Sequence, residues 1–570
     1  MGLPIEPSEA GDEGPHAAGD GETLYAFYDL DICTVTFDFF SFLLRAELFR
    51  ESNGFKRLFV VFVPGSHDGF RLMHHDGEAS RWRMRNIHGP GCWFLRSVCG
   101  MVHCVNRPQA AAIEAANEAA IFPVGYTTRI VDSQRAIDAM IDAFMFSGLV
   151  AEFVKGADIP VLSPSATAVA WVDSWLKAHC SGKRPVVMTL REARYDRLRN
   201  SNLAAWARFA SELDQEKYAA VIVRDTDAVF DPVPDEIKGF AICAEASLDV
   251  QVRLALYEAA HLNLLVNNGP LALCYLNPKI RYLVFKHFTL GQSEVARATF
   301  AVYGIPLFGQ TPLSTSAQRN AWKDDTYENI AEEFSKMSAF IEAEEEDGRK
   351  DTLSARKALT VDEALQSAVS MHSVGRIEPA AAIYEHLRAQ HPYRADIAGM
   401  LGLARHHQGR DADARILLTE AIGRAPDKAI HHFNLGIVLR ATGAPEGAIT
   451  AFEDALGCDP QMRAAHENLG DIFVELENWK VAARHYGAAI DLGSTDSRTF
   501  RALAVCLEEL GERRVAFSLY RQIIRHAERQ QEVLDEALKT AQPQLENRYD
   551  DLHDRFVLPS KRASALREAS

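Results

Sequence analysis

Hydrophobic residues in the first 335 positions follow two alternating patterns. Short continuous runs of apolar and β-branched residues, each ended by turn residues, predict buried strands. Longer amphipathic stretches between these runs predict helices. The predicted strands cover residues 58–63, 185–190, 219–223, 262–266 and 282–285, and the predicted helices cover residues 136–154, 202–213 and 248–261. This alternation favours parallel α/β layers, which a break near residues 156–164 divides into two lobes.

A different pattern, with a period of 34 residues, occupies the C-terminal third of the chain. The residues that recur at this step are the pairs Leu401-Gly402, Leu435-Gly436, Leu469-Gly470 and Leu503-Ala504, the alanines 380, 414, 448, 482 and 516, the large residues Tyr384, Leu418, Phe452, Tyr486 and Tyr520, and the prolines 392, 426 and 460. Small residues allow two helices to pack closely, the large residue fills the groove between them, and proline ends the second helix.

This period and order of residues resemble the tetratricopeptide repeat family. Five copies fit between residues 361 and 530. The resemblance implies an all-α solenoid that binds a protein partner.

Composition narrows the class of protein. The net charge of −17 over 570 residues argues against a general nucleic-acid or membrane-surface binder. Nine scattered cysteines, several within apolar runs, predict reduced core thiols and a cytoplasmic location. We see neither a signal peptide nor an apolar run long enough to span a bilayer. We therefore expect no nucleic-acid partner and no membrane span.

The composition shifts along the chain predict six segments. They are a disordered acidic tail (residues 1–22), a first α/β lobe (23–155), a second α/β lobe (156–335), an acidic linker (336–360), five repeats (361–530) and a helical tail (531–570).

The first candidate site is an arginine-rich loop after the predicted strand at residues 185–190. Thr189 ends the strand, and Arg191, Arg197 and Arg199 follow before a helix that Ser201 or the next residue can cap. Ligands of parallel α/β sheets bind outside the carboxyl ends of the strands, and arginine forks and helix N-termini both favour phosphate. The loop therefore suits a diphosphate; the alternative is a solvated basic loop.

Two more strand ends carry candidate ligand groups in the same lobe. Asn267, Asn268 and Gly269 precede a proline suited to a first helical turn, an arrangement that either offers backbone N–H groups to an anion or is an ordinary strand–helix turn. Asp225 and Asp227 follow another strand and suit a divalent ion or a ribose; the alternative is a turn with side-chain hydrogen bonds. Glu245 either faces the same site or caps the next helix.

The first lobe contributes a fourth candidate at a strand end. His67 and Asp68 lie between two glycines after the predicted strand at residues 58–63. Both side chains can exchange protons near neutral pH. They are acid–base candidates; the alternative is a plain loop.

Two α/β lobes with phosphate-binding arginines in the second resemble the GT-B class of nucleotide-sugar glycosyltransferases, a two-lobed Rossmann-like fold. The order of the segments 189–191, 225–227 and 267–269 is similar to that of the fucosyltransferase-like families. The resemblance implies that Arg191 holds the diphosphate of a nucleotide-sugar donor, supported by the Asn-Asn-Gly turn, and that neither a cofactor nor a metal is required. His67 or Asp68 would then deprotonate the acceptor. The chain departs from the family pattern, since Thr189 stands in place of a histidine and a second adjacent arginine is missing.

The repeats suggest the acceptor. Asn434 and Asn468 occupy the same position in two successive repeats, an arrangement similar to the asparagine ladder of the O-linked N-acetylglucosamine transferases, which binds peptide backbone. The alternative is that each amide bonds within its own repeat. The sequence thus predicts a glycosyltransferase with a protein acceptor, and its alternative is a non-catalytic repeat scaffold with a degenerate α/β region.

Overall fold

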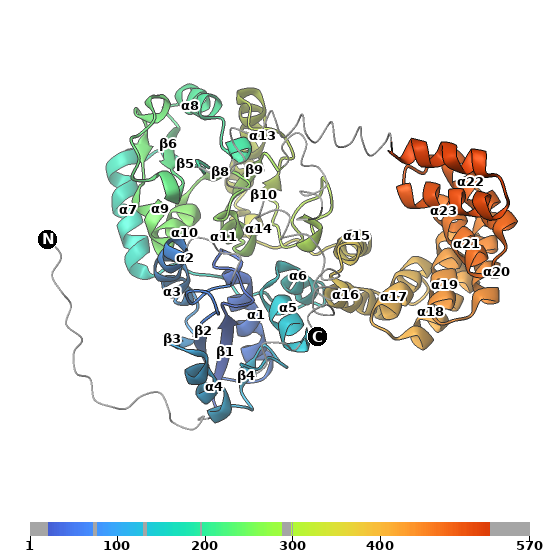
Figure 1. Cartoon of the computed structure of the whole chain (residues 1–570). Helices are drawn as coiled ribbons and strands as arrows, with labels where there is room; N and C mark the ends of the chain where they lie inside the picture. Colours follow the sequence, from blue (N-terminus) through green and yellow to red (C-terminus); the bar gives the residue numbers. More distant parts are fainter. Residues whose placement is uncertain are drawn as a thin grey trace. The chain divides into compact units, whose positions relative to one another are not determined.

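The chain divides into two compact units, residues 1–379 and residues 380–570, in a computed structural model (Figure 1). The structure describes residues 21–71, 77–128, 134–193, 197–287, 298 and 300–524. Residues 1–20 of the predicted tail at 1–22, and the whole predicted tail at 531–570, lie outside this part. No helix within these ranges is long and apolar enough to cross a membrane.

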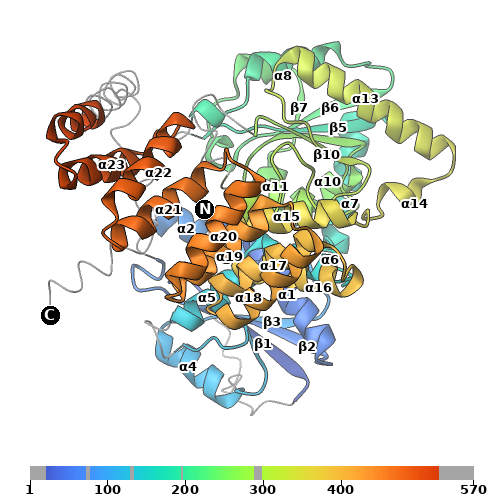
Figure 2. The ribbon, with the colours of Figure 1, turned by 90° about the vertical axis from the view of Figure 1, so that its right-hand side faces the viewer.

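The first unit contains two separate parallel sheets (Figure 2). The first has the strand order β3-β2-β1-β4, and every neighbouring pair is parallel. Its strands are β1 (Thr23–Asp29), β2 (Arg57–Val63), β3 (Val98–His103) and β4 (Ile121–Phe122). Helices α1 (Phe39–Ser52) and α4 (Arg107–Ala116) connect them and contact β2.

The second sheet has the strand order β10-β9-β8-β5-β6-β7, again all parallel. Its strands are β5 (Arg184–Thr189), β6 (Tyr218–Val223), β7 (Ala241–Ile242), β8 (Leu262–Val266), β9 (Tyr282–Phe285) and β10 (Gln318–Asn320). In chain order this is the 3-2-1-4-5-6 arrangement of doubly wound sheets, which reverses its direction of winding between β5 and β8. Strands before residue 156 and strands after residue 184 therefore belong to different sheets.

Helices cover both faces of the second sheet. Trp206 of α8 (Leu203–Glu212) and Phe334 of α13 (Tyr327–Glu346) pack on the apolar side chains of β5, β8 and β9. Helices α7 (Ala166–Cys180) and α10 (Val250–Ala259) pack together and contact β5 on the other face. Every residue of β8 and β9 is buried, as expected for strands covered on both sides.

Two predicted segments differ from the structure. The helix predicted at residues 136–154 is broken at Met145, whose extended backbone separates α5 (Gln134–Phe144) from α6 (Phe146–Val154). The acidic run at residues 342–347, predicted as part of a linker, continues α13 as far as Glu346. Glu342 pairs with Lys217 at 2.5 Å and with Arg184 at 3.2 Å, so cations of the second lobe hold this run in place.

Six further α-helices of the first unit have described bounds. They are α2 (Gly77–Arg83), α3 (Gly89–Cys92), α9 (Glu245–Leu248), α11 (Leu271–Leu276), α14 (Lys350–Leu353) and α15 (Val361–Ser373). The nine cysteines of the chain all lie in described segments, where all are free thiols and seven are buried.

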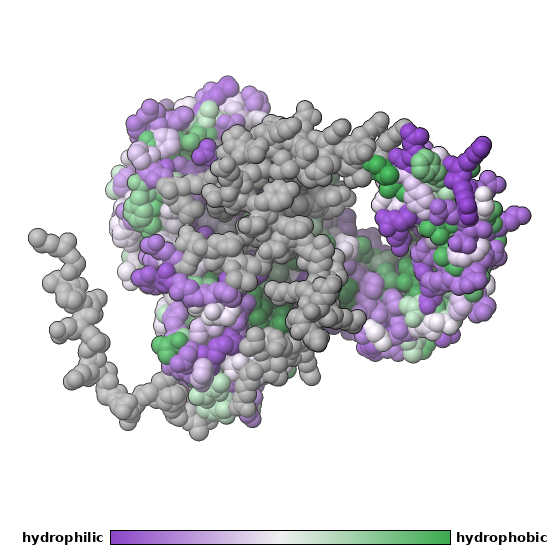
Figure 3. Space-filling view, in the orientation of Figure 1, coloured by the Kyte–Doolittle hydropathy of each residue, from purple (hydrophilic) through white to green (hydrophobic). Residues whose placement is uncertain are grey.

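Helix pairs form the repeat array. After α15 the helices are α16 (Ile377–Gln390), α17 (Ala395–His407), α18 (Asp411–Arg424), α19 (Ala429–Ala441), α20 (Pro445–Cys458), α21 (Arg463–Glu475), α22 (Trp479–Asp491) and α23 (Ser497–Glu509), and residues 513–524 are also helical. We call α17, α19, α21 and α23 the first helices, and α16, α18, α20 and α22 the second helices, of their repeats. Hydrophilic side chains predominate on the solenoid surface seen in Figure 3.

The packing predicted from the 34-residue period is confirmed. A Cβ atom added at Gly402, Gly436 or Gly470 would lie 2.6–2.8 Å from the large residue of the same repeat, namely Leu418, Phe452 or Tyr486. The five recurring alanines are fully buried. Glycine is therefore the residue that lets the two helices of these repeats approach each other.

Candidate functional site

The reversal of winding in the second sheet brings two predicted segments together. Arg191 follows β5, Asn267 follows β8, and these strands are neighbours. An amino group of Arg199 donates to the backbone oxygen of Asn267 at 3.0 Å. The arginine loop and the Asn-Asn-Gly turn thus meet at the carboxyl edge of the sheet, where doubly wound folds bind ligands.

Hydrogen bonds fix the base of the arginine loop. Ser201 accepts from the Arg191 N–H through its side chain at 2.9 Å and donates its own N–H to the Arg191 carbonyl at 3.0 Å. The side-chain amide of Asn200 accepts from the N–H of Ala193 and donates to its carbonyl. The side chain of Lys286 donates to the backbone carbonyl of Asn200 at 2.8 Å. The side chain of Arg191 is buried, Arg199 is half-buried, and Arg197 is exposed. Of the predicted arginines, Arg191 and Arg199 therefore lie inward.

Thr189, which was predicted to bind the donor, lies beneath the edge of the sheet. Its side chain is buried, and its hydroxyl lies 2.8 Å from the hydroxyl of Tyr257 on α10. The same tyrosine accepts from an amino group of Arg253 at 3.4 Å. Thr189 is thus part of a hydrogen-bonded chain beneath the edge of the sheet.

Arg253 is a residue that the sequence analysis missed. It is 3% exposed, its Nε donates to the Ala246 carbonyl at 2.6 Å, and no carboxylate among the described residues forms an ion pair with it. A buried guanidinium without an acidic partner favours an anion nearby. The available signal was an arginine between two apolar residues, Val252 and Leu254, of α10.

The first three N–H groups of the helix after the Asn-Asn-Gly turn are already bonded. Helix α11 has only six residues. The N–H groups of residues 271–273 already bond the carbonyls of Asn268, Gly269 and Pro270. What the turn does present is the side-chain oxygen of Asn268, which is buried and accepts no hydrogen bond from a described residue.

The three acidic candidates differ in their surroundings. Asp225 accepts the Glu192 N–H at 3.2 Å, and Glu192 forms a bidentate ion pair with the buried Arg224. The Asp227 side chain lies outside the described part of the structure. Glu245 is exposed at the start of α9 and does not cap α10, because Asp249 accepts the N–H groups that begin that helix.

The first lobe meets the Asn-Asn-Gly turn through a segment that the sequence analysis did not single out. A Cβ atom on Gly269 would lie 3.0 Å from the ring of Phe37. The next residue, Asp38, accepts from the hydroxyl of Tyr303 at 3.3 Å and from Thr36 at 2.9 Å. Burial raises the pKa of the Asp38 carboxyl above its ordinary value. A titratable acid is therefore the chain neighbour of Phe37, the residue that contacts the turn.

His67 and Asp68 are exposed, and their polar contacts lie within the first lobe. His67 Nδ1 lies 3.0 Å from the Ser66 hydroxyl, and Asp68 pairs with Arg81 at 2.5 Å. Their role as acid–base groups stays a prediction.

In the solenoid, the two predicted asparagines are not equivalent. Asn468 donates to the Ala464 carbonyl at 2.9 Å and accepts from Arg440 at 3.2 Å, so its amide is used within the repeats. Asn434 is 2% exposed, and its buried amide nitrogen has no described hydrogen-bond partner. These contacts favour the local alternative for Asn468 over a shared ladder.

Known proteins resemble the chain in its repeat region. The tetratricopeptide repeat family model matches residues 373–429 and 413–463. Among curated proteins, tetratricopeptide repeat protein 37 of Xenopus laevis is 30% identical over 160 residues (27% of this chain and 10% of that protein). Protein FlbA of Caulobacter vibrioides is 30% identical over 122 residues (20% of each). The chain thus covers a fifth or less of the length of these relatives.

Solved structures match about a third of the chain at low similarity. The crystal structure of MamA protein is 17% identical, with a TM-score of 0.27, and the match covers 30% of this chain and 94% of that one. A Pseudomonas aeruginosa pilF structure is 18% identical with a TM-score of 0.28, over 34% of this chain and 88% of that one. The helix pairs, their 34-residue period and the family match together identify the C-terminal region of this chain as tetratricopeptide repeats.

Proposed function

We propose that the chain is an adaptor whose tetratricopeptide repeats hold a partner protein. The observation that carries this proposal is the series of helix pairs with a constant period, since such arrays form extended binding surfaces. The first helices also expose apolar side chains: Ile430 is 41% and Val505 is 37% exposed. Apolar side chains at the surface of a repeat array suit contact with another protein.

Site-specific photo-crosslinking tests the adaptor proposal in the full chain. A photoreactive residue in place of Ile430 or Val505 should form a cross-link to one specific protein in the cells that make the chain. The same residue in place of Glu453, which is exposed on the second helix α20, is the matched control. Cross-links that are equally diffuse at all three positions would contradict partner binding by the first helices.

A second candidate function, sugar transfer from a nucleotide-diphosphate donor to the recruited protein, is favoured by one observation. Arg191, Arg199 and the Asn-Asn-Gly turn converge where the second sheet reverses its winding. The buried Arg253 adds positive charge near the same strand ends. In this proposal Asp38, the chain neighbour of the Phe37 that contacts Gly269, joins His67 and Asp68 as a candidate to deprotonate the acceptor.

Thermal shift with a panel of nucleotide-diphosphate sugars tests the second candidate. A ligand at 100 times its Kd stabilises the state that binds it by about 2.7 kcal/mol. Arg191→Ala should weaken binding by about 1.5–3 kcal/mol, because a charge-assisted hydrogen bond to phosphate is lost. Arg208→Ala, which removes an exposed arginine from α8, is the control. No shift with any nucleotide sugar, or equal shifts in both variants, would remove the transferase proposal and leave the adaptor.

A further inference from the structure

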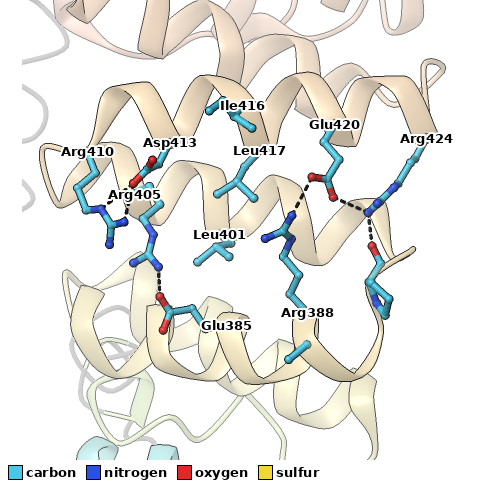
Figure 4. Close-up of a pocket in the computed structure, with 12 residues that line it drawn as sticks. Glu385, Arg388, Leu401, Arg405, Arg410, Asp413, Ile416, Leu417, Glu420 and Arg424 are labelled. Carbon is cyan, nitrogen blue, oxygen red and sulfur yellow. Dashed lines mark hydrogen bonds and ion pairs between the residues drawn. The ribbon is translucent and has the colours of Figure 1, made fainter.

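A groove lies on the second-helix side of the first complete repeats. Its cavity volume is about 630 Å³, and α16, α17 and α18 line it (Figure 4). Leu401 and Leu417 lie between its charged ends, and Ile416 is 66% exposed beside them. The groove thus combines an apolar middle with ionic ends.

Positive charge exceeds negative charge at one end of this groove. Arg388 and Arg424 share a single carboxylate, that of Glu420, at 2.8 Å and 2.7 Å. Arg424 also donates to the Pro392 carbonyl. The Nε of Arg388 is buried and makes no hydrogen bond to a described residue. Two guanidinium groups on one carboxylate leave the charge of one of them uncompensated.

The opposite end is compensated. Arg410 pairs with Asp413 at 2.6 Å, and Arg405 pairs with Glu385. A ligand that is attracted by charge should therefore choose the end at Arg388 and Arg424.

The repeat fold does not require these arginines. The residues 34 and 68 positions further on are Ile422 and Leu456 for Arg388, Leu439 and Phe473 for Arg405, and Cys458 and Leu492 for Arg424. Leu439, Leu456 and Phe473 pack on the apolar core of the next repeats. Ion pairs that replace apolar packing are weak contributors to stability, so another role accounts better for them.

We propose that this groove docks an acidic peptide segment of a partner protein. A glutamate or aspartate side chain pairs with Arg388 and Arg424, and a neighbouring apolar side chain covers the exposed Ile416. Guanidinium groups bind carboxylates through paired, charge-assisted hydrogen bonds, and the uncompensated charge supplies the attraction. The inference rests on the proposed adaptor function. It gives the repeats a second binding surface, in addition to the one on the first helices.

Fluorescence anisotropy on the full chain tests the docking site. The probe is a labelled, C-terminally amidated decapeptide of alternating leucine and glutamate, and its twin carries glutamine at every glutamate. The glutamate peptide should bind at least ten-fold more tightly than the twin. Raising the salt concentration should reduce that difference, because exposed charges are screened.

Two variants separate binding from folding. Arg388→Leu and Arg424→Leu should each weaken binding of the glutamate peptide at least ten-fold and leave the melting temperature unchanged or higher, since the later repeats carry apolar residues there. Arg415→Leu is the matched control, because Arg415 is an exposed arginine of α18 outside the groove. Its affinity for the glutamate peptide should equal that of the unmodified chain.

Equal affinity for the two peptides would overturn the proposal, as would full binding by Arg388→Leu. An equal loss in Arg415→Leu would also overturn it, because attraction would then come from surface charge in general. If these results occur while Val505 still cross-links a specific protein, the groove proposal fails and the adaptor function stands.

Discussion

Substitution of one glycine in the solenoid should loosen a single repeat by a predictable amount. A Cβ atom at Gly470 would lie 2.7 Å from Cε1 of Tyr486, whereas ordinary contacts begin at 3.4 Å, so the ring must retreat. Tyr486 is 3% exposed, and its hydroxyl donates to Asp471 at 2.6 Å. The ring therefore cannot move without disturbing buried contacts and this hydrogen bond.

The magnitude follows from two opposing effects. Overpacking a well-packed interior costs about 1–3 kcal/mol, and weakening the hydrogen bond adds up to about 1 kcal/mol. Alanine recovers about 1 kcal/mol relative to glycine through helix propensity. These contributions sum to a range of about 0–3 kcal/mol. We take its middle, so Gly470→Ala should destabilise the repeat by about 1.5 kcal/mol, which corresponds to roughly ten-fold faster exchange through local opening.

Hydrogen exchange with mass spectrometry measures this effect, because it resolves α21 and α22 within the full chain. Gly487→Ala is the matched control: Gly487 lies inside α22, and a Cβ atom there would meet nothing within 4 Å. That variant should slow exchange through the helix-propensity gain alone. Unchanged exchange in Gly470→Ala, or faster exchange in Gly487→Ala, would refute the reasoning that close helix contact selects glycine at position 470.

Three other predictions concern the first unit. Burial lowers the pKa of His88 to about 3, so the unfolded chain takes up a proton that the folded chain refuses, and stability should fall as pH drops from about 6.5 towards 3; His88→Phe should flatten this dependence in pH-dependent thermal unfolding. Arg107→Met should cost about 3–5 kcal/mol by denaturant unfolding, because it strands the buried carboxylate of Asp29, and pairing it with Asp29→Asn should restore much of the loss. Thr360→Ala should destabilise α15 by about 1 kcal/mol, seen as faster exchange at its start, since Thr360 and Glu363 form a capping box.

The sequence could predict the parts of the fold that leave a regular pattern of apolar residues within a short stretch of the chain. Each repeat packs in the same way, so the fixed spacing between Gly436 and Phe452 predicts their contact. Strands β5, β6, β8 and β9 were predicted because they are rich in buried apolar residues. Strands β4, β7 and β10 have two or three residues each, so they are too short to show a periodic pattern in the sequence.

The candidate site likewise contains residues that a local pattern predicts and residues that it does not. Arg191 and Asn267 were predicted because each follows a strand, and strand ends of a parallel sheet share one edge. The partners of these segments come from far along the chain. Arg253 reaches Thr189 through Tyr257, and Asp38 meets the turn from the other lobe. No local pattern encodes such contacts, because packing of distant elements creates them.

The reversal of winding between β5 and β8 has a consequence for how this unit can diverge. The position where strand ends open toward a ligand is set by the path of the chain, whereas the side chains found there are free to vary. Substitutions in the loops that follow these strands would therefore keep the position of the site and change what binds there. Loss of one chemistry and gain of another would need only loop substitutions, with the sheet inherited intact.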